Sequence, residues 1–134
     1  GYKYLTSPFK LSFIASAMYR FPEIIVNDDK NKKLQYKDKN IIPKIKKKMR
    51  SILRISYLNN HDCLVLSAWG CGAFRNPPEH QAEIWNDVLN ENEFKNVFKC
   101  IVFAILDDYN TKKQHNPNGN FKPFADVFGT KQLL

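Results

Sequence analysis

Several features that would narrow the function are missing from this sequence. No apolar run approaches the roughly 18–20 residues of a membrane-spanning helix, so we expect no membrane partner. The three cysteines are an odd number and none stands in a C-x-x-C pair, which disfavours a disulfide framework and a cysteine-rich zinc site. The chain opens on Gly1 without a charged leader and an apolar stretch, so we expect no signal peptide. These absences together predict an intracellular protein, cytoplasmic or nuclear, with no metal and no cofactor.

What the sequence does contain is enough for one folded domain. Its 134 residues are 43% hydrophobic, which suffices for a core and excludes wholesale disorder. We therefore expect residues 1–134 to form a single domain or part of one. The net charge of +8 is concentrated between Lys30 and Arg54, where eleven basic residues accompany one acid, Asp38. Such a run could attract nucleic acid, but most of these cations are lysines, which are typical of an ordinary solvated surface.

The hydrophobic pattern predicts alternating strands and helices. Strands are indicated at 9–17, 63–68 and 98–106, the second as a buried strand. Helices are indicated at 41–58, from 76–78 onward, and at 121–128. Residues 27–40 are expected to form an exposed, mobile basic loop, and residues 111–120 a second loop. Strands that alternate with helices predict an α/β fold with a mostly parallel sheet covered on both faces.

The segment after the second predicted strand carries the clearest chemical signal. Trp69-Gly70-Cys71-Gly72-Ala73-Phe74 follows the strand, and a helix starts a few residues later at Asn76-Pro77-Pro78. Glycines here allow positive φ angles and let a ligand approach bare N–H groups, as in sites that hold phosphates. The pattern lacks both the third glycine of a dinucleotide fingerprint and the Gly-Lys-Ser/Thr of a triphosphate loop. On its own, a plain tight turn fits it about as well.

The sequence around this segment resembles that of a known family. Leu64 to Pro78, with Val102-Phe103-Ala104-Ile105-Leu106-Asp107 downstream and Phe13 to Ala17 upstream, is similar to the microbial-type poly(ADP-ribose) glycohydrolases of the macrodomain superfamily. The resemblance implies a three-layer α/β/α macrodomain-like fold, of which this chain would be the C-terminal half. It also implies ADP-ribose or poly(ADP-ribose), or an ADP-ribosylated protein, as the partner.

The resemblance also implies roles for particular residues. Gly70, Cys71, Gly72 and Ala73 would wrap the diphosphate through their backbone N–H groups, and Phe74 would pack against the sugar end. The adenine would lie against the end of the third predicted strand. Phe103 is the only aromatic residue there, whereas the spacing from Phe74 favours Ile105, and both stay open at this point.

The acid that would break the glycosidic bond is missing from this chain. In the family, a glycine-rich stretch and a paired Gln-Glu-Glu motif supply it, and the sequence contains neither Gly-Gly-Gly nor adjacent glutamates. The resemblance therefore implies the ADP-ribose-binding part of a glycohydrolase-like protein, with hydrolysis confined to an intact parent. The alternatives are a non-catalytic ADP-ribose or nucleotide reader, and a basic nucleic-acid-binding protein.

Other residues have ordinary interpretations beside chemical ones. Cys71 with His80 as nucleophile and base lacks a third orienting group, and His61, His80 and His115 lack the paired spacing of metal ligands. Asp107-Asp108 could bind a ribose hydroxyl or a metal, or cap the helix that follows. Trp85 is expected in the core, and Trp69 beneath the glycine loop.

Overall fold

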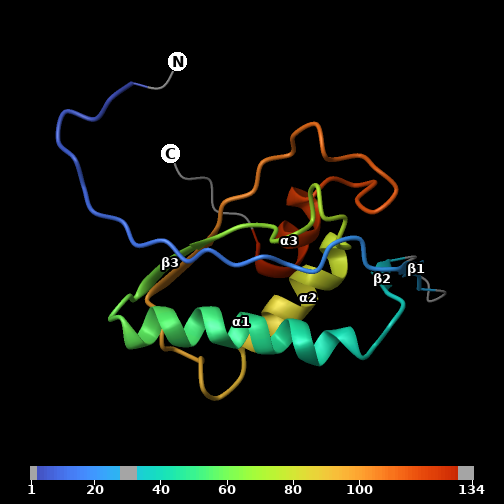
Figure 1. Ribbon diagram of the computed structural model, residues 1–134, viewed down its shortest axis with the longest axis horizontal. Coiled ribbons are helices and arrows are strands. Elements are labelled where there is room, and N and C mark those ends of the chain that lie inside the picture. Colours follow the sequence, from blue (N-terminus) through green and yellow to red (C-terminus); the bar gives the residue numbers. More distant parts are fainter. Residues whose placement is uncertain (1–2, 28–32, 130–134) are drawn as a thin grey trace.

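The computed structural model describes residues 3–27 and 33–129 and shows an α/β arrangement with three helices around short strands (Figure 1). The alternating strands and helices predicted for 63–128 are present in the predicted order. The elements are β1 (Ile24–Val26), β2 (Leu34–Tyr36), α1 (Ile41–Leu58), β3 (Cys63–Leu66), α2 (Pro78–Leu89), β4 (Cys100–Phe103) and α3 (Phe121–Phe128).

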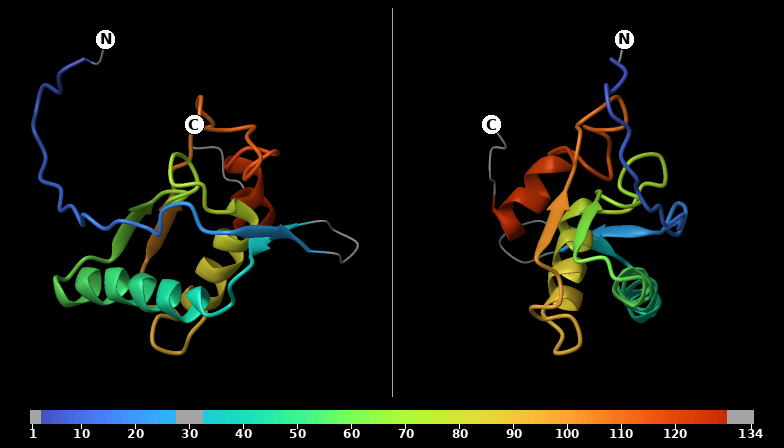
Figure 2. Two further views of the ribbon diagram at one scale, coloured as in Figure 1. Left: turned by 45° about the vertical axis from the view of Figure 1, so that its right-hand side comes forward. Right: turned by 90° about the vertical axis from the view of Figure 1, so that its left-hand side faces the viewer.

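The parallel pairing predicted from the sequence is confirmed for β3 and β4. Their register runs from Cys63 opposite Cys100 to Leu66 opposite Phe103. β1 and β2 form a separate antiparallel hairpin (Figure 2). Leu66 and Phe103 pack against the core, but Val65 on the opposite face is 77% exposed. The expectations of a buried strand and of a sheet covered on both faces are therefore wrong for the described residues, where helices pack on one face of this pair.

α1 confirms the predicted amphipathic helix. Ile45, Met49 and Leu53 are fully buried at four-residue steps, as the periodicity requires. The helix ends where the pair of asparagines was expected to end it. Asn59 donates from its side chain to the Ile55 carbonyl, and Asn60 takes a left-handed conformation with φ of 60°.

Much of the basic run is paired with acids inside the molecule. Three cations on α1 meet acids on or just beyond α2, which lies across it, and two more directly flank β2. The ion pairs are Lys46–Asp87 at 2.8 Å, Arg50–Glu91 at 2.7 Å, Arg54–Glu93 at 2.5 Å, Lys33–Glu83 at 2.8 Å and Lys37–Glu23 at 2.7 Å. The positive charge therefore serves in part to join α1 to α2, which weakens its case as a nucleic-acid surface.

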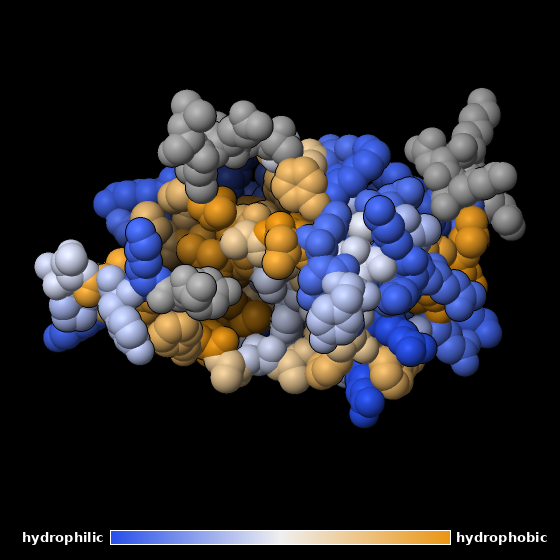
Figure 3. All heavy atoms as spheres, turned by 90° about the horizontal axis from the view of Figure 1, so that it is seen from above, coloured by the Kyte–Doolittle hydropathy of each residue, from blue (hydrophilic) through white to orange (hydrophobic). Residues whose placement is uncertain are grey.

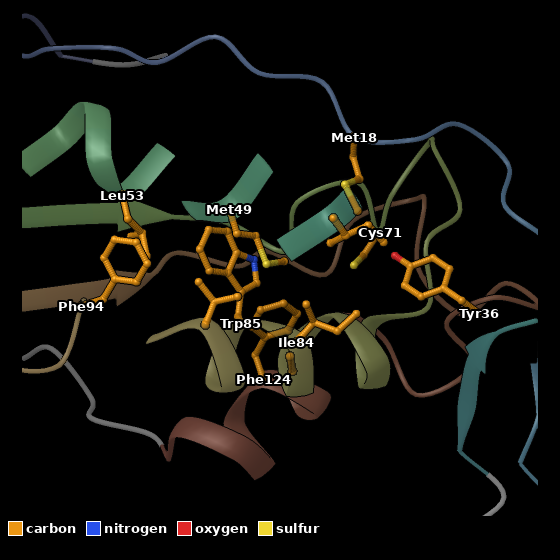
Figure 4. Packing of buried hydrophobic residues seen from close by; sticks show 12 residues of the cluster. Met18, Tyr36, Met49, Leu53, Cys71, Ile84, Trp85, Phe94 and Phe124 are labelled. Atoms are coloured by element: carbon orange, nitrogen blue, oxygen red, sulfur yellow. The ribbon is translucent and has the colours of Figure 1, made fainter. Parts of the chain in front are cut away.

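The core lies between the three helices and one face of the β3–β4 pair. Seen from above, apolar side chains gather around a hollowed part of the surface (Figure 3). Trp85 of α2 is 1% exposed and stands at the centre of the packing (Figure 4), as the sequence predicted. Phe103 continues this core toward α3, with ring centroids 4.6 Å from Phe128 and 5.1 Å from Phe124.

The strand predicted at 9–17 is wrong. Residues 3–17 form an exposed arm without regular secondary structure, and the chain reaches the core only at Met18. Side chains from elsewhere hold the end of the arm: Trp69 Nε1 donates to the Ser16 carbonyl at 2.9 Å, and Lys48 Nζ donates to the Ala17 carbonyl at 2.8 Å. Alternating residues can form a strand only beside an open strand edge with matching hydrogen bonds, and this arm is tethered by side chains instead.

The uniform loop predicted at 27–40 is also wrong in part. Residues 28–32 lie outside the described residues, but Leu34 to Tyr36 form β2, and Tyr36 is fully buried against α2. A tertiary contact thus overrides the polar composition of this segment. The predicted loop over 111–120 and helix over 121–128 are confirmed.

Candidate functional site

The glycine loop predicted as the ligand site is a compact turn between β3 and α2. Gly70 has φ of 81°, the left-handed conformation that glycine adopts without strain. A Cβ atom there would lie 2.6 Å from Met18 Cβ and 2.7 Å from Asn76 Nδ2, closer than real contacts allow. Gly70 is therefore required by the fold itself.

Asn76 holds the loop in shape and was not singled out by sequence analysis. Its fully buried side chain donates from Nδ2 to the carbonyls of Gly70 at 3.0 Å and Tyr19 at 2.8 Å. Its Oδ1 accepts the hydroxyl of Tyr36 at 2.8 Å, and Gln81 Nε2 donates to that same hydroxyl at 2.5 Å. One side chain thus connects the arm, the loop and β2.

Burial of the Tyr36 phenol raises its pKa, so it remains a neutral donor to Asn76. The hydroxyl of Tyr36 points toward the loop that carries Cys71 (Figure 4). The only sequence signal for this network was the position of Asn76 just before Pro77-Pro78, which marks a helix start but not a buried amide.

The amide groups of the loop divide into two sets. Cys71 N–H donates to the Ala68 carbonyl at 2.9 Å, so the backbone donor expected at Cys71 is already occupied. Within the described residues, the N–H groups of Gly70, Gly72, Ala73 and Phe74 have no protein acceptor. Four amides therefore remain for a ligand or for water.

A hollow of about 230 Å³ is lined by the residues that carry these amides. Its volume is close to the lower limit for small-molecule sites, so it suits part of a ligand rather than a whole dinucleotide. It is lined by Ser16, Met18, Trp69, Gly70, Gly72, Ala73 and Phe74.

Gly72 differs from Gly70. Its φ lies outside the left-handed region, so a positive φ explains the glycine at position 70 but not the one at position 72. A Cβ atom at Gly72 would meet Asn110 Cβ at 3.6 Å, an ordinary contact. The fold would accommodate alanine here and does not require glycine. Close approach by a ligand is therefore a separate reason for glycine at this position.

The underside of the loop is tied to the segment that precedes α3. The Cys71 carbonyl accepts His115 Nε2 at 2.9 Å and Asn116 Nδ2 at 3.3 Å. Burial raises the pKa of the Cys71 thiol, which stays protonated and inert. His80 instead accepts the Tyr36 backbone N–H through Nδ1 at 3.1 Å. A Cys71–His80 nucleophilic pair therefore has no support.

The structure gives no support to a metal site among the remaining candidate residues, and it gives Asp107 a structural role. Asp107 Oδ1 accepts the backbone N–H groups of Asn120 at 2.7 Å and Phe121 at 3.1 Å, which makes it the cap of α3. Among the described residues, no three His, Cys, Asp or Glu side chains lie close enough to hold a metal ion. No described helix is long and apolar enough to cross a membrane.

The chain matches no protein-family model and no curated protein. It is similar, however, to solved structures of poly(ADP-ribose) glycohydrolase from Deinococcus radiodurans. A complex of that enzyme with ADP-ribose is 30% identical, with a TM-score of 0.54, and the match covers 70% of this chain and 34% of the enzyme. The apo form is 31% identical with the same TM-score, over 66% of this chain and 33% of the enzyme.

The predicted resemblance is confirmed. This chain is similar in fold and sequence to part of a poly(ADP-ribose) glycohydrolase, and its α/β fold is macrodomain-like. It spans about one third of the length of the glycohydrolase chains that it matches.

In this glycohydrolase-like chain, two of the expected ligand residues lie away from the hollow. Phe103 belongs to the aromatic cluster with α3, and Ile105 packs half-buried against the core. Phe74 does line the hollow, and its carbonyl accepts the N–H of Phe21 at 2.9 Å. The structure thus brings Gly70, Gly72, Ala73 and Phe74 together, and separates the two adenine candidates from them.

Proposed function

We propose that this chain binds ADP-ribose, with the diphosphate held by the loop from Gly70 to Phe74. The observation that carries the proposal is the set of four unpaired amides beside the hollow, which would donate to phosphate oxygens. The glycohydrolase that the chain resembles is known in complex with ADP-ribose, which supports the choice of ligand. Cys71 serves this loop by burying its side chain underneath, rather than by its amide.

The proposed activity of the chain by itself is binding. None of the described residues that line the hollow is an Asp or a Glu, so no carboxyl group stands ready to protonate a leaving oxygen there. We assign glycosidic hydrolysis only to a longer protein in which a glycine-rich run and paired glutamates adjoin this loop. Recognition of ADP-ribosylated proteins would require binding by this loop but no catalytic carboxyl group.

Gly72→Val tests the proposal. The added Cβ atom would meet Asn110 at an ordinary contact distance of 3.6 Å, so we expect the fold to tolerate it. A branched side chain beside the unpaired amides should obstruct the diphosphate, so we expect at least a tenfold loss of ADP-ribose affinity by calorimetry. Ser51→Val on the exposed face of α1 is the matched control, since it adds the same side chain far from the loop. Wild-type affinity in Gly72→Val with an unchanged melting temperature would exclude the loop from binding.

A further inference from the structure

Two exposed cysteines face each other across the parallel strands. Cys63 and Cys100 are the first residues of β3 and β4 and are direct partners in the register. Both are free thiols and both are exposed, whereas Cys71 is buried. Neighbouring strands lie about 4.8 Å apart and register partners share a face, which falls within the Cα separation of about 4.4–6.8 Å that disulfides span.

The start of the two strands is held in place by the residues just before these cysteines. Lys99 N–H and Cys100 N–H both donate to the Asp62 carbonyl, at 2.8 Å and 3.3 Å. The Lys99 ammonium also pairs with the Asp62 carboxylate at 2.7 Å. These contacts fix the two strand ends side by side, so the backbone positions of the two cysteines are set by the fold.

The Cys63 thiol is also affected by the charged groups around it. A hydrogen bond to the Asp62 carboxylate raises the pKa of Cys63, and the nearby Cys100 adds to that rise while Lys99 opposes it.

We propose that Cys63 and Cys100 form a reversible redox pair, closed to an intramolecular disulfide by a small disulfide such as oxidised glutathione. One cysteine thiolate attacks a glutathione sulfur, which releases reduced glutathione and leaves a mixed disulfide. The second cysteine then loses its proton and attacks the protein sulfur of that bond, which releases another reduced glutathione. The two cysteines lose two electrons and two protons, and oxidised glutathione gains both.

The bond would join the two strands that lead into the candidate site. β3 continues into the Gly70–Phe74 loop and β4 leads to Asp107, which caps α3. A disulfide here would lower the conformational entropy of the unfolded chain and so raise the melting temperature under oxidising conditions. This inference stands independently of ADP-ribose binding.

Intact mass spectrometry of the 134-residue chain tests the pair. The reduced protein is incubated with excess oxidised glutathione, its remaining thiols are blocked with N-ethylmaleimide, and its mass is measured. After subtraction of any N-ethylmaleimide on Cys71, we expect a monomer two hydrogen atoms lighter than the unmodified reduced chain, carrying no glutathione and no label on Cys63 or Cys100, with peptide mapping that links these two residues. The melting temperature should rise and return on addition of dithiothreitol.

Cys63→Ser and Cys100→Ser provide the contrast, because each removes the sulfur that resolves the mixed disulfide. Each variant should therefore retain one glutathione that the wild type releases. Wild-type protein that keeps glutathione as the variants do, or that forms disulfide-linked dimers instead, would overturn the proposal. The wild-type mass decides the question even where a variant folds poorly.

Discussion

At the scale of single residues, the presence of glycine on each side of Cys71 has a different physical explanation at each position. Gly70 is fixed by its positive φ and by Met18 and Asn76 pressed against it, so any side chain there disrupts the fold. Gly72 has neither constraint, and the nearest atoms to a Cβ built there belong to Asn110, at ordinary contact distance. A substitution at Gly72 can therefore report on a ligand, whereas one at Gly70 reports on folding.

A second residue-scale prediction concerns His80. Its burial lowers its pKa below the ordinary 6.5, against the opposing charges of Glu83 and Asp87, and its Nδ1 must be unprotonated to accept the Tyr36 N–H. The unfolded chain therefore takes up the proton first as pH falls. The stability is complete above the unfolded-state pKa of about 6.5 and decreases as pH falls through and below it.

We expect the melting temperature to fall by a few degrees between about pH 7.5 and about pH 5.5. His80→Asn keeps an acceptor near the Nδ1 position but cannot titrate, so its melting temperature should vary less with pH. Thermal unfolding followed by circular dichroism across this range makes the comparison. An equal dependence of the melting temperature on pH in the variant would show that His80 does not govern the acid sensitivity. Burial also lowers the pKa of His115, so His115 should account for the pH dependence that remains in His80→Asn.

At the scale of elements, the sequence predicted best where an element's own residues decide its structure. The spacing of Ile45, Met49 and Leu53 indicated α1 because helical periodicity is local. The strand expected at 9–17 failed because a strand needs ladder hydrogen bonds to a partner, and the end of this arm is instead held by the side chains of Trp69 and Lys48. β2 was missed because Tyr36 is buried by contacts with α2, which lies more than forty residues away along the chain.

Asp107 offers an element-scale prediction. Its carboxylate, thirteen residues upstream, accepts the first N–H groups of α3, and the sequence left this role open beside ribose or metal binding. Asp107→Ala should reduce the free energy of unfolding by about 1 kcal/mol, measured by urea denaturation, because loss of a cap costs that much. Asp107→Asn retains an acceptor oxygen and should keep most of this stability. Equal losses in both variants would point to the charge instead of the hydrogen bonds.

At the scale of the whole molecule, the sequence predicted the loop of the candidate site but not the residues that hold that loop in shape. The loop from Gly70 to Phe74 was predicted from a glycine pattern after a strand, and the structure places a hollow over it. Asn76 was missed because a buried amide that joins three segments leaves no local pattern. The sequence also left the adenine contact open between Phe103 and Ile105, and both of these side chains pack against the core, which no local pattern predicts.

The β3–β4 pair gives the whole-molecule prediction. Within residues 3–27 and 33–129 these strands pair only with each other, and Val65 is 77% exposed on the uncovered face. Exposed apolar strands with open edges favour association, so the chain should self-associate at high concentration. Val65→Thr keeps the β-branch, adds a hydroxyl, and should lower the associated fraction in sedimentation velocity. Ile55→Thr makes the matched change on α1, where no strand edge is present, and should leave association unchanged. An equal decrease in both variants would show that general surface hydrophobicity, and not the open sheet, brings the chains together.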